Sequence, residues 1–280
     1  MKPAREKLRI VQIGDTRFAI DDSGVPLIQG APLVFLHGAV QTRQVWESQW
    51  RAFSGARRVV VPDLRGHGET TGSFEDLSIE THARDVVALL DRLEIDRALV
   101  CGVFLGGMVA LAMAAKAPER ITGLILADTP LALSMTGPVR ALIEWLGPQR
   151  ILWPFFRVLG RRGTARLGLA LARLMLSRKW VGPMGGRHFV DGFSQMAPAA
   201  IVATYAGIVA ADPITVEMPD KPCLLILGRH ETKTVVAQAS EIASRLGQAE
   251  IVLVDGGHVP NIDAPYEFNR AVHQFLEKIR

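Results

Sequence analysis

The sequence has few cysteines and few aromatic residues, and it lacks the common motifs of cofactor and metal sites. Its 280 residues include two cysteines and 6% aromatic residues. Cys101 and Cys223 both lie in apolar runs, so we expect reduced, buried thiols and not a disulfide. No P-loop, dinucleotide fingerprint, CxxC pair or HExxH motif occurs, and therefore no cofactor or metal is expected.

Targeting and membrane signals are also missing. Residues 1–13 are charged and then alternate in polarity, without the apolar core of a secretory signal. No transmembrane segment is expected. Together with the reduced thiols, these features predict a cytoplasmic protein.

Charge is distributed unevenly along the chain. The net charge is +4, but residues 131–216 contain ten Lys and Arg against three acids, so this segment carries +7 and the remainder −3. Arginines scattered among Leu and Ala at helical spacing predict a solvated helical face. Attraction of an anionic substrate or of a membrane surface is the alternative. No nucleic-acid partner is expected.

Strand-like and helix-like segments alternate along most of the chain. Residues 8–13 and 17–21 predict a hairpin around Gly14-Asp15, and Ser78 is expected to cap a helix that ends near Leu93. Short apolar runs predict buried strands at 32–37, 58–62, 97–102, 121–128, 222–228 and 250–254. Helices are predicted at 43–53, 78–93, 105–117, 235–246 and 266–279. This alternation predicts an α/β fold with a mostly parallel sheet and helices on both faces.

The middle of the chain departs from this rhythm. Residues 131–216 contain apolar helical stretches and no buried strand. We expect breaks at Gly147-Pro148, Pro154, Gly182-Pro183 and Gly185-Gly186. The segment is therefore predicted to be a helical cap inserted after the sixth strand, with the core domain formed by 1–130 and 217–280.

Ligands of such sheets bind beyond the carboxyl ends of the strands, so the residues that follow each strand are the candidates for a site. Five stretches that contain these residues resemble the α/β-hydrolase superfamily, in particular its capped enol-lactonases and C–C bond hydrolases. They are VFLHG (34–38), VPDLRGHGET (61–70), GVFLGGMVALAMAAKAPERITGLILADT (102–129), LLILGRHETK (224–233) and GGHVPNIDAPYEFNRAVHQFL (256–276). The resemblance covers nearly the whole chain and implies the α/β-hydrolase fold.

One position departs from the family pattern. The G-x-S-x-G elbow of the family, which carries the nucleophile, is Gly102-Val103-Phe104-Leu105-Gly106 here. The benzyl group of Phe104 has no lone pair and no ionisable proton, so it cannot form a covalent intermediate. Cys101 is no substitute, because it is expected to pack inside the preceding strand.

The resemblance implies that the rest of the machinery is present. It assigns the general base to His258 and the acid to Glu231, with Asp128 as an alternative acid. Backbone amides of Ala39 and Leu105 would form the oxyanion hole. An apolar substrate pocket is also expected. His37, Trp46 and Phe104 are candidates for contact with substrate, although His37 alternatively stabilises its own turn, as Asp63, Arg65 and His67 are expected to stabilise theirs.

Aromatic residues of the cap are expected to serve mainly in packing, with some lining the pocket. They are Trp145, Trp153, Phe155, Phe156, Trp180, Phe189, Phe193 and Tyr205.

Three functions remain open on these residues. The first is an enzyme without a covalent nucleophile, in which His258 removes a proton from a small hydrophobic carbonyl-type substrate or from water. Lyase, cyclase, isomerase, decarboxylase and direct hydrolysis are the candidate reactions. The second is an inert pseudo-hydrolase that binds a small molecule or a partner. The third is an ordinary serine hydrolase that carries a Ser-to-Phe substitution at position 104.

Overall fold

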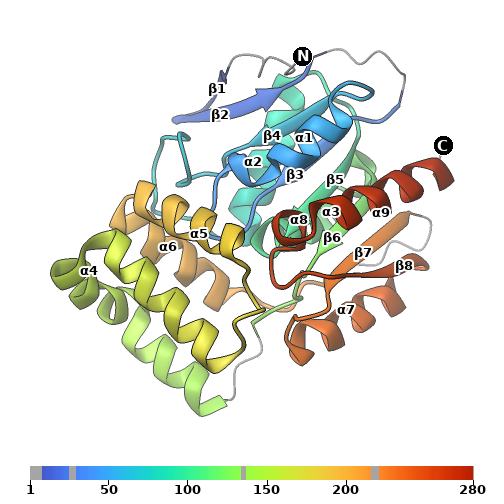
Figure 1. Cartoon of the computed structure of the whole chain (residues 1–280). Helices are drawn as coiled ribbons and strands as arrows, with labels where there is room; N and C mark the ends of the chain where they lie inside the picture. The colour runs from blue at the N-terminus through green and yellow to red at the C-terminus, as the bar shows by residue number, and fades with distance from the viewer. Residues whose placement is uncertain (1–7, 25–29, 134–136, 216–220, 280) are drawn as a thin grey trace.

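The computed structural model describes residues 8–24, 30–133, 137–215 and 221–279. It contains one eight-stranded sheet with the order β1-β2-β4-β3-β5-β6-β7-β8 (Figure 1). The strands are β1 (Arg9–Ile13), β2 (Thr16–Asp22), β3 (Leu33–Leu36), β4 (Val59–Pro62), β5 (Ala98–Val103), β6 (Ile121–Ala127), β7 (Pro222–Gly228) and β8 (Gln248–Val254). The β1–β2 and β2–β4 pairs are antiparallel and the other pairs are parallel, so the prediction of a hairpin followed by a mostly parallel sheet is confirmed.

Helices cover both faces of the sheet. One face packs against α2 (Ile79–Arg92), α3 (Leu105–Lys116) and α7 (Lys233–Arg245), and the other against α1 (Glu47–Phe53), α8 (Pro260–Asp263) and α9 (Pro265–Lys278). The short 3₁₀ helices η1 (Arg43–Trp46) and η2 (Pro118–Arg120) precede α1 and β6. Ser78 caps α2 as predicted, because its hydroxyl accepts a hydrogen bond from the Thr81 amide.

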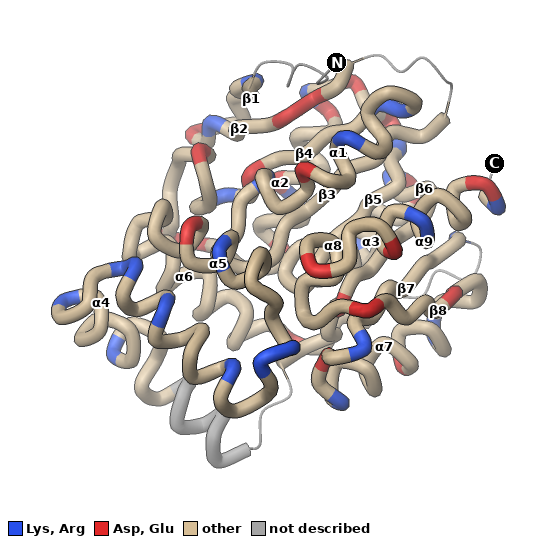
Figure 2. The backbone as a smooth tube through the Cα atoms, viewed as in Figure 1, with Lys and Arg blue, Asp and Glu red and all other residues tan. Residues whose placement is uncertain are grey.

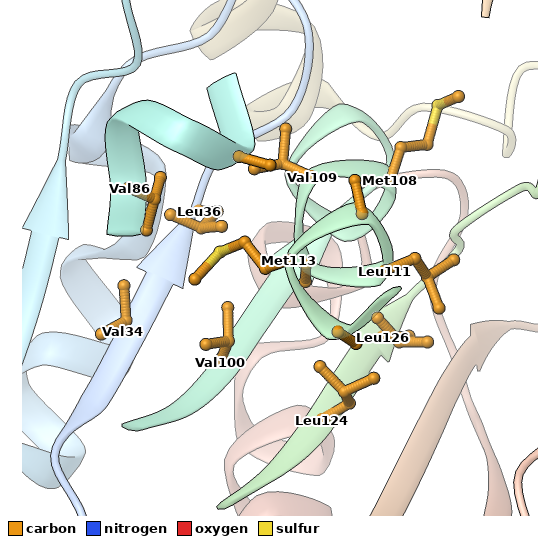
Figure 3. Packing of buried hydrophobic residues seen from close by; sticks show 14 of the residues in the cluster. Val34, Leu36, Val86, Val100, Met108, Val109, Leu111, Met113, Leu124 and Leu126 are labelled. Atoms are coloured by element: carbon orange, nitrogen blue, oxygen red, sulfur yellow. The ribbon is translucent and has the colours of Figure 1, made fainter. Parts of the chain in front are cut away.

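Strands β3 to β7 contain no charged residue because both of their sides are covered, whereas the outer strands β1, β2 and β8 do (Figure 2). In β3, Val34 and Leu36 face the cluster under α2 and α3, whereas Leu33 and Phe35 face the cluster under α1 and α9. Figure 3 shows the first of these clusters, in which Met113 of α3 lies near Leu36 and Val100 of the strands. Cys101 and Cys223 are buried in β5 and β7 as free thiols, which agrees with their expected packing role.

The connection from β6 to β7 forms the cap, which consists of α4 (Gly137–Met175), α5 (Pro183–Gln195) and α6 (Pro198–Ala210) (Figure 1). The expected boundary between 216 and 217 lies outside the described residues. No single helix in the described part of the chain is long and apolar enough to span a membrane. Helices α5 and α6 are long and apolar enough only when taken together, and they are bent by 117° relative to each other.

Two of the predicted breaks in the cap are wrong. Helix α4 is interrupted at Gly147, as expected, and then at Gly160, but not at Pro154. Gly160 has a φ of 64°, a conformation that glycine adopts readily. Pro154 lies on an exposed stretch, where the carbonyl that it leaves unpaired can be hydrated. Gly185 and Gly186 also lie inside the continuous helix α5.

The loop after β4 is held by buried charges, as predicted for Asp63, Arg65 and His67. The Asp63 carboxylate is fully buried and accepts hydrogen bonds from the amides of Arg43 and Glu69, at 2.6 and 2.9 Å. Arg65 forms a bidentate pair with Asp85, with both distances 2.7 Å. These contacts fix the loop.

Three buried histidines adjoin this loop. The rings of His37 and His67 are 5.0 Å apart and those of His67 and His82 are 6.1 Å apart. Burial lowers the pKa of His37 to about 4 and the pKa of His67 and His82 to about 3. All three are therefore neutral in the folded protein at neutral pH.

This cluster predicts acid lability. Below pH 6.5 the unfolded chain binds protons at these histidines and the folded chain does not, so the free energy of unfolding falls as pH drops toward 4. Each histidine contributes about 1.4 kcal/mol per pH unit in that range. Urea titrations at a series of pH values give the slope of the free energy of unfolding against pH. For His82→Leu this slope should be smaller than in the wild-type protein by about 1.4 kcal/mol per pH unit. The exposed control His273→Gln should keep the wild-type slope, and equal slopes for all three proteins would contradict the prediction.

Candidate active site

The turn between β5 and α3 has the geometry of a strained elbow. Phe104 joins the two elements with φ 46° and ψ −107°, a conformation that costs a residue with a side chain about 1–3 kcal/mol. A Cβ on Gly106 would lie 2.1 Å from the carbonyl oxygen of Leu36, and one on Gly102 would lie 2.2 Å from Gly106. The two glycines therefore allow the helix and the strands to approach as closely as the elbow requires.

The ring of Phe104 lies in the expected nucleophile position, next to the predicted base. Its centroid is 5.0 Å from the centroid of the His258 imidazole, and the rings meet edge to face. The ring also packs against both core clusters. Phe104 is thus anchored as an apolar wall beside the imidazole.

The structure brings together the predicted base and acid. His258 Nδ1 lies 2.6 Å from Glu231 Oε2. The Glu231 side chain is 0% exposed and that of His258 is 15% exposed. Burial alone would raise the pKa of Glu231, but hydrogen bonds from His258, the Thr232 amide and Trp180 hold it below its usual value. The carboxylate is therefore ionised and oriented, and it fixes the imidazole with Nδ1 as the donor.

Trp180, which lies between α4 and α5, was expected only to pack in the cap or to line the pocket, and not to hold the acid and the base. Its indole Nε1 donates to Glu231 Oε1 at 3.0 Å, and its ring stacks on His258 at 4.5 Å. The Trp180 carbonyl also accepts a hydrogen bond from the His258 amide at 2.6 Å. The cap thus positions both members of the pair. A tryptophan after Ser177-Arg178-Lys179 carries no sequence signal of this role, because the contact depends on how the cap folds back.

Asp128, the alternative acid, does not contact His258. It is fully buried at the end of β6, and its carboxyl group accepts a hydrogen bond from the Gly228 amide at 3.1 Å. Burial and the nearby charge of Glu231 raise the pKa of Asp128 well above its usual value. Glu231, and not Asp128, is therefore the partner of the imidazole.

A cavity of about 300 Å³ opens beside the pair. Its wall includes His258, Phe104 and Ala39 from the core, and Trp180, Phe189 and Tyr205 from the cap. The ring of Phe104 therefore leaves space next to the imidazole. Burial raises the pKa of the Tyr205 hydroxyl to about 12, so this group stays neutral.

Ala39 and Gln41 line this cavity, and Leu105 directly follows the lining residue Phe104. Neither of the predicted oxyanion amides, those of Ala39 and Leu105, donates a hydrogen bond to another described residue. Gln41 also lines the cavity, and its Oε1 accepts from the Gly38 amide at 3.0 Å, which leaves its NH₂ group without an acceptor in the described chain. Gln41 was not predicted, although its place three residues after the His-Gly turn is a usable signal.

Two predicted substrate contacts are wrong. Trp46 is fully buried and packs against Phe35 and Phe268, 4.9 and 5.9 Å away, so it belongs to the core. His37 is also fully buried; its Nδ1 donates to the Gly38 carbonyl and its Nε2 accepts from the Leu64 amide. It serves the alternative role of turn stabilisation. Neither side chain lines the cavity.

The arrangement agrees with comparisons of the chain with known proteins. Residues 31–265 match the family described as the α/β hydrolase fold. The chain belongs to this α/β-hydrolase family. It is 23% identical to 3-oxoadipate enol-lactonase 2 of Acinetobacter baylyi over 88% of each chain. It is also 28% identical to a pimeloyl-[acyl-carrier protein] methyl ester esterase of Nitrosomonas europaea, over 85% of this chain and 93% of the esterase.

A solved structure extends the comparison to three dimensions. The enol-lactonase of Burkholderia xenovorans superposes with a TM-score of 0.76 at 25% identity, covering 96% of this chain and 100% of the lactonase. The fold predicted for this α/β-hydrolase chain is thereby confirmed, and its homologues are enzymes.

The contacts of Trp180 predict its contribution to stability. Trp180→Phe keeps a ring beside His258 but removes a hydrogen bond to a buried carboxylate, so the free energy of unfolding should fall by about 1.5–3 kcal/mol. Trp145→Phe, at a cap tryptophan that is 72% exposed, should change it by less than about 0.5 kcal/mol. Denaturant titrations compare the two variants. Equal effects would show that the indole nitrogen contributes nothing to holding Glu231.

Proposed function

We propose that this chain is an enzyme for a hydrophobic carbonyl substrate that uses His258 as a general base and forms no covalent intermediate. One observation carries the proposal. The imidazole is held by a buried carboxylate and borders an open cavity, although the residue at the elbow cannot attack. A protein that only binds a ligand has no need of a desolvated, ionised carboxylate fixed to an imidazole.

The hydrogen bond to Glu231 sets the direction of proton transfer. Because Nδ1 donates to the carboxylate, Nε2 carries the lone pair and is the atom that accepts a proton. The proton comes from a carbon next to the substrate carbonyl, or from a water that attacks that carbonyl. The electron pair moves onto the carbonyl oxygen, and the ionised Glu231 stabilises the imidazolium until the proton is returned.

The oxygen that gains charge needs donors placed in advance. The free amides of Ala39 and Leu105 supply them, and the NH₂ group of Gln41 is a third candidate at the same wall. A backbone donor is independent of the side chain at position 104, so the loss of a nucleophile does not remove it. Phe104 contributes an apolar surface against which a hydrophobic substrate packs.

The substrate class follows from the cavity and from the relatives. Most of the cavity wall is aliphatic or aromatic, which favours an apolar substrate over a strongly polar one. The relatives are, by name, an enol-lactonase and a methyl ester esterase, and an enol lactone and an ester each present a carbonyl group. We therefore place this chain among enzymes that polarise a carbonyl.

Loss of the base should abolish turnover. We expect His258→Gln to lower the rate by about 10²–10⁴-fold, because Gln has no basic nitrogen. The assay is a panel of aryl esters, enol lactones and aliphatic ketones in D₂O, followed by NMR for product and for deuterium uptake next to the carbonyl.

Two further variants complete that assay. Glu231→Gln should lower the turnover rate of any substrate that His258→Gln affects, because Glu231 holds the imidazole. Asp128→Asn should lower it far less, because the Asp128 carboxyl group is bonded to the Gly228 amide and not to His258. Turnover that survives in His258→Gln would contradict general-base catalysis. No turnover of any compound by the wild-type chain would favour the inert pseudo-hydrolase.

A serine at the elbow is expected to make the protein reactive toward a covalent probe. In Phe104→Ser, a hydroxyl would stand beside His258 on a backbone already in the elbow conformation, so a fluorophosphonate probe should label this variant. The wild-type chain and the control Phe104→Ala should remain unlabelled. Phe104→Ser should also lower the free energy of unfolding by about 2 kcal/mol, because the ring packs against both core clusters. A rise in stability would instead favour an elbow adapted to serine.

A further inference from the structure

A second hollow lies inside the cap, outside the wall that faces His258. It has a volume of about 380 Å³ and is lined by residues of α4, α5 and α6, together with Leu133. Among the lining side chains only Thr164 and Tyr205 carry a polar atom, and the Thr164 hydroxyl already donates to the Gly160 carbonyl at 2.7 Å. The hollow therefore offers an occupant almost nothing except apolar surface.

This cap cavity adjoins the cavity beside His258. Gly168, Phe189 and Tyr205 line both, so the two spaces share a wall formed by one residue from each cap helix. The two spaces are therefore adjacent, and an occupant of both would pass these three residues. The volume of each space lies near the lower limit for ligand pockets, which measure about 300–1,000 Å³.

Gly168 is exposed and lies where the two cavities meet, so a passage between them would run past this residue. It lies inside helix α4, where glycine is unfavourable by about 1 kcal/mol relative to alanine. A Cβ built on Gly168 would meet no heavy atom within 4 Å, so a side chain there would project into open space. The absence of a side chain keeps this passage wide.

The far end of the cap cavity reaches the surface. Phe155 and Leu171 line it and are 41% and 48% exposed, respectively. An occupant can therefore be elongated without being limited by a closed end. A linear apolar chain fits these features, whereas a compact polar molecule would leave its hydrogen-bonding groups unpaired.

We propose that the cap cavity binds the unbranched hydrocarbon tail of the substrate, whose carbonyl end reacts at His258. The substrate class is therefore an aliphatic acyl compound or alkyl ketone with a long tail. This inference rests on the proposed function for the role of the carbonyl end. Binding of the tail itself is measured without turnover.

The test uses straight-chain 2-alkanones of increasing length as probes, with affinities from calorimetry. Each added CH₂ that enters an apolar cavity should tighten binding roughly fourfold. We expect this increase to continue to long chains in the wild-type protein and in Gly168→Ala. In Gly168→Phe, which fills the passage, it should stop at the length that the cavity beside His258 accommodates.

A second variant guards against misfolding of Gly168→Phe. Leu171→Glu places a charge at the exposed end of the cap cavity, and it should weaken binding of long alkanones while leaving short ones unchanged. An early plateau in the wild-type protein, or identical length profiles for Gly168→Ala and Gly168→Phe, would overturn the proposal. If the length dependence holds but His258→Gln retains turnover, the tail site stands and the proposed catalytic role fails.

Discussion

The hydrogen bond between Glu231 and His258 is the interaction on which the rest of the site depends. It joins the loop after β7 to the loop after β8, and Trp180 joins both to the cap. A buried carboxylate is stable only when its oxygens are satisfied, and here the imidazole, the indole and the Thr232 amide supply the donors. Removal of any one of them would leave the buried charge with one hydrogen bond fewer. The geometry of the Glu231–His258 pair therefore depends on how the cap docks on the core.

The elbow imposes the second constraint. Its backbone stores strain that a covalent enzyme would use to present a nucleophile, yet a carbon ring occupies that point. Strain of this kind persists because the surrounding packing holds it, and the ring of Phe104 adds to that packing instead of reacting. The consequence is a pocket with base, acid and amide donors arranged around an inert wall. Proton transfer is the chemistry that such an arrangement can support.

Most of the fold could be predicted from the sequence because its buried strands are short, wholly apolar and separated by helices. The positions of Phe104, Glu231 and His258 followed from the rule that functional groups come after strands, combined with family motifs. The contacts of Trp180 with Glu231 and His258 could not be predicted, since they arise from long-range folding of the cap and no local pattern marks them. The prediction for Trp46 was wrong. An aromatic residue close to a site in the sequence is a reasonable candidate for a pocket wall, but tertiary packing places Trp46 in the core. Pro154 showed that an exposed helix tolerates a proline that sequence rules treat as a break.

The central claim is that this chain performs its chemistry without bonding to its substrate. Rapid-quench mass spectrometry of the intact protein, during turnover of any carbonyl compound that it consumes, tests this most directly. The account predicts that the protein mass stays at that of the free chain at every time point. A transient gain equal to an acyl fragment of the substrate would contradict it.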